Sequence, residues 1–224
     1  MQEARKRMRS DPKERPNAAS AAMDAWEKAY TNQGRIWGGA PFPVENMPDA
    51  ARVLEMGCGS GRLLAALAGK ASECIGFDFS RTACRLSRQA VSDPGVTILT
   101  ADACHIPIRP SCIDVVVAYH IVGHQTERDR TALCLEAARV LRKGGQLIFC
   151  DFSEKDFRAG RGQAIEDRTY LRGNGIITHY FTEEEIRSIP GPFRICSLAT
   201  VSHPMVVSGK AFNRSELVAT YTRL

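Results

Sequence analysis

Short apolar runs and amphipathic stretches alternate along most of this chain. Runs with almost no polar residue are typical of strands that are buried on both faces of a sheet. Helical spacing separates them, and strands that alternate with helices predict βαβ units and a parallel sheet. The predicted strands are ARVLEM (51–56), ECIGFD (73–78), VTILTAD (96–102), CIDVVVAYHIV (112–122) and QLIFCDF (146–152), and the predicted helices are 61–71, 80–91 and 127–145.

The end of the chain breaks this alternation. FTEEEIRSI (181–189) predicts a short helix opened by Thr182, with Glu185 completing a capping box. Residues 193–202 and 215–224 then form two predicted strands with only a turn between them, so the two must be antiparallel. The predicted fold class is therefore α/β: a Rossmann-like, seven-stranded, mostly parallel sheet with helices on both faces and an antiparallel last strand.

The first 48 residues differ in character from the rest. Residues 1–16 hold six Lys/Arg and three acids, which is +3 of the net charge of +5. Residues 17–30 have helical spacing, and 38–48 are rich in Gly and Pro. We interpret 1–48 as a basic arm and helix, and 49–224 as the main domain. Such an arm suits nucleic acid or an acidic partner, although a solvated terminus is the commoner case.

Composition limits the class of protein. The chain has 224 residues, of which 44% are hydrophobic and 25% charged, as expected of one soluble domain. No stretch approaches the roughly 18 apolar residues of a membrane helix, and the N-terminus lacks the layout of a secretory signal, which predicts a cytoplasmic protein. Its eight cysteines form no C-x-x-C pair, so we expect buried thiols and no metal.

Three consecutive strand ends carry candidate ligand-binding residues. Gly57, Gly59 and Gly61 follow the first strand, at the edge where open α/β sheets bind ligands. Glycines so closely spaced cost backbone entropy, which indicates a ligand lying against the backbone. Asp78 ends the second strand and can accept both hydroxyls of a ribose, whereas Asp102 follows the third and can accept from an exocyclic amine. Together they suit an adenosine.

The motifs resemble those of a known family in order and spacing. VLEMGCGSGRLL, IGFDFS, TADACHIPI, IDVVVAYHIVGHQ and EAARVLRKGGQLIF, over about residues 50–152, are similar to the motifs of class I S-adenosylmethionine-dependent methyltransferases. The similarity is strongest for the UbiE-like, or methyltransferase type 11, group. The resemblance implies S-adenosylmethionine as the cofactor and methyl transfer as the activity.

The resemblance also implies roles for single residues. The methionine part of the cofactor would lie against Glu55 and the loop glycines Gly57, Gly59 and Gly61. The ribose hydroxyls would be held by Asp78, with Phe79 packing near the adenine. The adenine amine would donate to Asp102, the ring would meet the backbone of Ala103 and Cys104, and the backbone carbonyl of Tyr119 would face the cofactor.

The competing cofactor is NAD. Its fingerprint is G-x-G-x-x-G, whereas this loop reads G-C-G-S-G, with the third glycine one place early. Glu55 and Asp102 have no part in the dinucleotide pattern, and the antiparallel ending also favours S-adenosylmethionine.

Several residues are candidates for the acceptor side. A base is needed only if the acceptor must lose a proton, and the candidates are His120, His124 and His179, with Asp151 as a pocket-lining acid. Each histidine has the alternative of merely packing or capping its loop. In this family, the insertion corresponding to 153–180 and the N-terminal helix cover the substrate. Trp26, Tyr30, Arg35 and Trp37 are thus candidate lid residues, with ordinary packing as the alternative.

The acceptor itself stays open between two classes. The chain lacks the N-P-P-Y or D-P-P-Y of amino-methylating nucleic-acid enzymes, a Pro-Cys loop and adjacent cysteines. A small molecule is the leading hypothesis. A tRNA wobble base is the alternative, because RGNGIITHYFTEEEI faintly resembles wobble-uridine methyltransferases and the arm is basic. A non-catalytic binding module is a second alternative, but its usual mark is a degraded glycine loop or a lost ribose acid, and this chain keeps both. The oligomeric state is not indicated.

Overall fold

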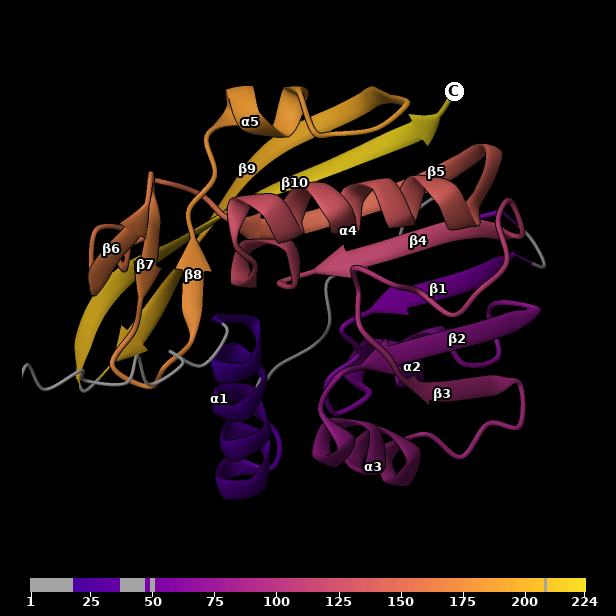
Figure 1. The fold of residues 1–224 in the computed structure, drawn as a ribbon, viewed down its shortest axis with the longest axis horizontal. Coiled ribbons are helices and arrows are strands. Elements are labelled where there is room, and N and C mark those ends of the chain that lie inside the picture. Colours follow the sequence, from indigo (N-terminus) through magenta and orange to yellow (C-terminus); the bar gives the residue numbers. More distant parts are fainter. Residues whose placement is uncertain (1–17, 37–46, 49–50, 208) are drawn as a thin grey trace, which may run out of the picture.

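One mixed sheet organises the molecule (Figure 1). The computed structural model describes residues 18–36, 47–48, 51–207 and 209–224. The sheet has the order β3-β2-β1-β4-β5-β10-β9, and every pair of neighbours is parallel except those involving β10, which is antiparallel to β5 and β9. This confirms the predicted fold class, with the reversed strand one place in from the edge. The strands are β1 Arg52–Met56, β2 Glu73–Asp78, β3 Val96–Thr100, β4 Ile113–Tyr119, β5 Leu141–Phe152, β9 Phe193–Val207 and β10 Lys210–Arg223.

Helices cover both faces of this sheet, because alternate strand residues bury on opposite sides. Leu54 and Met56 of β1 belong to a core that includes Leu133 of one helix, whereas Val53 belongs to a second core with Leu64 of another. The helices are α1 Ala18–Gln33, α2 Arg62–Leu67, α3 Arg81–Ala90, α4 Glu127–Val140 and α5 Glu183–Arg187, with a short 3₁₀ turn, η1, at Val122–His124. The predicted capping box at the start of α5 is present.

Several boundaries differ from the sequence prediction, among them the ends of α2 at Leu67 and of β3 at Thr100, which come earlier than predicted. Helix α4 ends at Val140 instead of continuing to Gly145, and β5 begins at once. Gly144 there has φ 77°, which a helix cannot use, and β5 pairs with β4 across an irregularity before Gln146. Strand β4 stops at Tyr119, and β9 and β10 extend into a long hairpin that ends at Val207 and Lys210.

The segment 153–180 contains a small sheet that the sequence pattern did not reveal. Strands β6 (Gln163–Glu166), β7 (Thr169–Leu171) and β8 (Ile177–His179) pair antiparallel in that order. Strands of three or four residues are too short to show a period-2 pattern. The sheet places β8 beside η1, which follows the end of β4.

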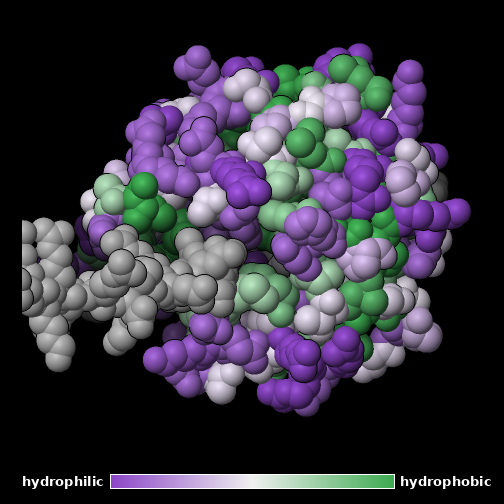
Figure 2. Space-filling model, viewed as in Figure 1, coloured by the Kyte–Doolittle hydropathy of each residue, from purple (hydrophilic) through white to green (hydrophobic). Residues whose placement is uncertain are grey.

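The remaining expectations concern the surface and the cysteines. All eight cysteines are free. Within the described ranges, no helix is both long and apolar enough to cross a membrane. Figure 2 shows mostly hydrophilic residues over one face, with smaller hydrophobic patches among them. The predicted basic arm, most of the 38–48 connector and Trp37 lie outside the described residues.

Candidate active site

A cavity of about 230 Å³ opens at the carboxyl ends of the parallel strands. The arrowheads of β1, β2, β3 and β4 point toward the side on which α1 lies (Figure 1). Trp26 and Tyr30 of α1 contribute to the cavity wall, and Ile177 of β8 contributes to it as well. The cavity is thus formed between the main sheet, the N-terminal helix and the small sheet.

Nine of the ten predicted cofactor residues line this cavity, and Gly61 does not. They come from the ends of β1, β2, β3 and β4, which are distant in sequence and adjacent in the sheet. The nine are Glu55, Gly57, Gly59, Asp78, Phe79, Asp102, Ala103, Cys104 and Tyr119.

The glycines of the loop serve two purposes. Gly57, Gly59 and Gly61 have φ of 68°, 53° and 80°, in the left-handed region that favours glycine. A Cβ on Gly59 would lie 2.7 Å from the hydroxyl of Tyr30, so the loop presents bare backbone to the cavity beneath α1. Gly61 instead faces α3, where its Cβ would lie 2.9 Å from the Cα of Ser87. It therefore lets α2 begin close to α3 and does not line the cavity.

Two buried carboxylates face the cavity. Oε2 of Glu55 has no hydrogen-bond partner among the described residues, and burial raises the pKa of this carboxyl well above its usual range. An unpaired buried oxygen is costly unless a ligand donates to it, which suits an amino group. Asp78 accepts from the amides of Gly59 at 3.1 Å and Ser80 at 2.9 Å. Both observations fit a ligand that carries an amine at one end and a ribose at the other.

A further carboxylate, Glu27, holds α1 against this site. Its Oε2 accepts from the hydroxyl of Ser80 and its Oε1 from that of Thr82, each at 2.6 Å. Because the Ser80 amide donates to Asp78, the docking of α1 and the position of Asp78 share one residue. The sequence analysis missed Glu27, since its partners lie more than 50 residues away and no local pattern marks the pairing.

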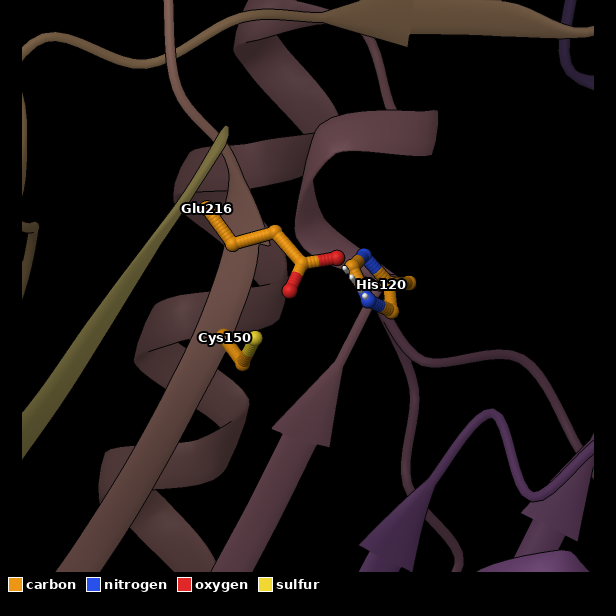
Figure 3. Close-up of side chains that lie close together, drawn as sticks. All are labelled: His120, Cys150 and Glu216. Atoms are coloured by element: carbon orange, nitrogen blue, oxygen red, sulfur yellow. Dashed lines mark ion pairs between the residues drawn. The ribbon is translucent and has the colours of Figure 1, made fainter. Parts of the chain in front are cut away.

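His120 follows β4 and lines the cavity. It has φ 52°, a value uncommon for residues other than glycine. Figure 3 shows the Glu216 carboxylate reaching from β10 toward its ring, with Nε2 to Oε1 at 3.3 Å, while Nδ1 lies 3.8 Å from Oδ1 of Asp151. Burial by itself lowers the pKa of His120, but the two carboxylates outweigh it and raise that pKa to about 9. The ring is therefore charged at neutral pH.

His124 of η1 also lines the cavity, whereas His179 and Asp151 do not. His179 is buried between Thr169, whose Oγ1 lies 2.8 Å from Nδ1, and Glu185, whose Oε1 lies 3.3 Å from Nε2. Asp151 is fully buried behind η1 and accepts from the Gly123 amide at 2.7 Å. The structure therefore brings His120 and His124 together at the cavity. It leaves His179 beside the small sheet. Asp151 is linked to the cavity only indirectly, through His120.

One cluster has the residue types of a metal site. The candidate ligand atoms of His120, Cys150 and Glu216 all lie within 4.8 Å of one another (Figure 3). In a zinc site, bonds of about 2.0–2.3 Å bring ligand atoms within roughly 4 Å of each other. Burial, with the nearby Glu216 and Asp151, raises the pKa of the Cys150 thiol, and the charged His120 ring carries a proton on each nitrogen, which leaves no electron pair for a metal. An ion-pair cluster accounts for this arrangement.

A parallel sheet in this order, with a glycine loop and a ribose-type acid at its carboxyl edge, defines a Rossmann-like domain that binds a nucleoside. Residues 54–149 match the family model described as a methyltransferase domain. A SAM-dependent methyltransferase from Methanosarcina mazei has the same fold, with a TM-score of 0.68 and 21% identity over 83% of this chain and 99% of that one. The family-model match identifies a methyltransferase domain at residues 54–149, as predicted, and S-adenosylmethionine is the cofactor that such a domain on this fold implies.

Curated relatives differ in what their names say they methylate. The tRNA N(3)-methylcytidine methyltransferase Mettl2 of Drosophila melanogaster is 29% identical over 61% of this chain and 46% of its own length. A demethylmenaquinone methyltransferase of Clavibacter sepedonicus is 29% identical over 65% of this chain and 62% of its own length. The matches thus span less than two thirds of either relative.

We expect the Asp78 carboxylate to make cofactor binding dependent on pH. Burial, opposed by the Ser80 and Gly59 amides, raises the pKa of Asp78 to about 6. Protonation removes acceptor capacity for a ribose, so affinity is lost as the pH falls through this value. We expect the dissociation constant of S-adenosylmethionine to be constant above about pH 7 and to rise about tenfold per unit below pH 6. Titrations between pH 5 and 8 measure this, and a flat profile would contradict it.

Proposed function

We propose that this protein is an enzyme that transfers the methyl group of S-adenosylmethionine to a small-molecule acceptor. The observation that carries the proposal is the convergence of Glu55, the Gly57–Gly59 loop and Asp78 on one cavity that also contains His120 and His124. A binding module without activity would not need a cavity with two histidines beyond the cofactor residues. The bound cofactor supplies an activated methyl group, and the protein aligns the acceptor with it.

The cofactor residues take the roles that the family resemblance implies. Oε2 of Glu55 receives the amino group of the methionine part, and Asp78 receives the ribose hydroxyls. Phe79 and the backbone of Ala103 and Cys104 surround the adenine. The remaining residues of the set act in the same way: Gly57 and Gly59 give backbone contact, Asp102 accepts from the adenine amine, and Tyr119 offers its carbonyl.

A small molecule fits the acceptor end of the cavity, because Trp26 from α1 and Ile177 from β8 both contribute to its wall. The alternative is a tRNA base, which the name of the fly relative favours. Radioactive methyl transfer from S-adenosylmethionine distinguishes the two. We expect counts in small hydroxylated ring compounds and none in unfractionated tRNA, and incorporation into tRNA alone would contradict the small-molecule proposal.

We also propose that α1 and the 153–180 insertion cover the bound substrates, with Trp26 and Tyr30 as the contacting residues. Arg35 does not line the cavity. An isolated helix of 16 residues is marginal in water, so its docking through Glu27 determines whether the cover is in place.

The Glu27→Ala variant tests this cover. It removes two short hydrogen bonds to Ser80 and Thr82. At about 1 kcal/mol each, we expect amide exchange in α1 to accelerate by more than about tenfold and cofactor affinity to fall several-fold. Asp24→Ala, an exposed acid on the same helix, is the matched control. Equal exchange in both variants would show that Glu27 does not hold α1.

A further inference from the structure

His120 and His124, two histidines of the cavity, differ in their hydrogen-bond partners and in their charge. Nδ1 of His124 lies 2.7 Å from the carbonyl oxygen of Ile177. Because a carbonyl only accepts, Nδ1 carries the hydrogen, and Nε2 of the neutral ring then bears a lone pair. Nε2 is buried and has no hydrogen-bond partner within the part of the chain that the structure describes. His120, by contrast, is held between two carboxylates and carries a charge.

The surroundings of His124 keep it neutral. The residue is 8% exposed, and the Trp26 ring of α1 packs edge-on against it with centroids 4.8 Å apart. Burial is the largest effect and lowers the pKa of His124, and the positive charges of His120 and Arg158 lower it further. Asp151 of β5 and the Ile177 carbonyl of β8 oppose this shift only in part. At pH 7 the ring is thus neutral, and the electron pair of its buried Nε2 has no hydrogen-bond partner among the described residues.

The two histidines lie in one cavity, one charged and the other neutral, and this difference indicates that they have different acid–base roles. His120 cannot accept a proton, since both of its ring nitrogens already carry one, with Nδ1 facing Asp151 and Nε2 facing Glu216. His124 can, and Asp151 lies close enough to stabilise the charge that results. Asp151 also fixes η1 itself through the Gly123 amide, where a Cβ would lie 2.6 Å from its Oδ1. His124 is therefore positioned by a rigid turn.

We propose that His124 accepts, through Nε2, the proton that the methyl acceptor loses on methylation. This inference rests on the proposed function. The acceptor atom forms a bond to the methyl carbon with its own electron pair, and its proton passes to Nε2, giving an imidazolium that returns the proton to solvent. The methyl–sulfur bond of the cofactor breaks with its electron pair left on sulfur as a thioether.

A built-in base defines the class of acceptor. Phenols, alcohols, quinols and thiols carry a proton at neutral pH that must leave when they are methylated. A pyridine-type ring nitrogen or a carboxylate already has a free electron pair and needs no base. The structure therefore favours a neutral hydroxyl or thiol as the methylated group.

The protonation state can be tested without knowing the natural acceptor. Nitrogen-15 NMR of the full chain, with S-adenosylhomocysteine bound, reports the tautomer of each histidine, and His124→Gln assigns the signal. We expect the His124 ring to be neutral at pH 7 with its hydrogen on Nδ1, and to titrate below the usual value of about 6.5. A hydrogen on Nε2, or a charged ring at pH 7, would overturn the proposal.

The proton transfer is tested with 1,4-naphthohydroquinone and 2-phenylethanethiol, both protonated at neutral pH, as probe acceptors and S-adenosylmethionine as donor. We expect His124→Gln to lower kcat by about 100-fold or more and to recover rate as the pH rises, because the probe then ionises unaided. His203→Gln, on an exposed residue of β9, serves as the control and keeps its rate. An unchanged kcat in His124→Gln, or methylation of cytidine alone, would overturn the proposal.

The affinity for S-adenosylmethionine is the second measurement. It should stay within about threefold in His124→Gln, because the charged contacts proposed for the cofactor come from Glu55 and Asp78 and not from His124. Loss of binding in the unsubstituted protein would instead contradict the proposed function.

Discussion

We expect the Asp78→Ala variant to bind S-adenosylmethionine at least about 100-fold more weakly than the unsubstituted protein. The Asp78 side chain accepts from the Gly59 and Ser80 amides, which orients it into the cavity. Hydrogen bonds to a charged group contribute about 1.5–3 kcal/mol each, and 1.4 kcal/mol is a factor of ten, so losing two ribose contacts gives this factor. Calorimetric titration measures it.

Asp167→Ala is the control for this prediction. Asp167 is an exposed acid beside β7, and it does not line the cavity. The control separates the loss of the ribose contact from a general effect of removing one negative charge. Binding by Asp78→Ala within threefold of the control would show that Asp78 does not hold the ribose.

The second large effect is expected from Gly61→Ala, and it concerns stability. Gly61 has φ 80°, and a Cβ there would lie 2.9 Å from the backbone Cα of Ser87. A left-handed non-glycine residue costs about 1–2 kcal/mol, and the steric overlap adds about 1–3 kcal/mol. For a domain of this size, we expect Tm to fall by roughly 5–15 °C.

Gly69→Ala is matched to this change. Gly69 has φ 75°, and apart from its chain neighbours no heavy atom of the described residues lies within 4 Å of its Cβ position, so only the backbone penalty applies. The free energy of unfolding from denaturant titration should fall by at least about 1 kcal/mol more in Gly61→Ala than in Gly69→Ala. Equal losses would mean that α2 and α3 separate without cost, and that Gly61 is needed only for its φ.

Much of the fold could be predicted because its signals are local. The inner parallel strands β1, β2 and β4 are buried on both faces, so Val115, Val116 and Val117 appear in sequence as one apolar run, and the pairing follows from strand–helix alternation. The glycine loop and Asp78 were visible for the same reason: each directly follows a strand. Their meeting at one cavity then required only that parallel strands end at one edge.

The acceptor side could not be predicted in the same way, because its contacts join distant segments. Glu216 reaches His120 from a strand 96 residues later, and Ile177 fixes the tautomer of His124 from a strand of only three residues. His120, His124 and His179 look alike in sequence as single histidines within a few residues of an isoleucine. Only packing distinguishes the charged ring, the neutral ring and the one held by Thr169 away from the cavity.

The boundaries that moved have a physical reason as well. The sequence of α4 continues with helix-compatible residues beyond Val140, but pairing of Leu141 with Ile113 extends the sheet, and Gly144 tolerates the left-handed turn that follows. Sheet hydrogen bonds therefore outcompeted a weak local preference for helix.

The central claim is that the cavity at the carboxyl edge binds S-adenosylmethionine through Glu55, Gly59 and Asp78. Calorimetric titration of the purified, unsubstituted protein with S-adenosylmethionine, and in parallel with NAD, tests it most directly. The structure leads us to expect saturable binding of S-adenosylmethionine and none of NAD. Binding of NAD, or of neither compound, would contradict this assignment of the site.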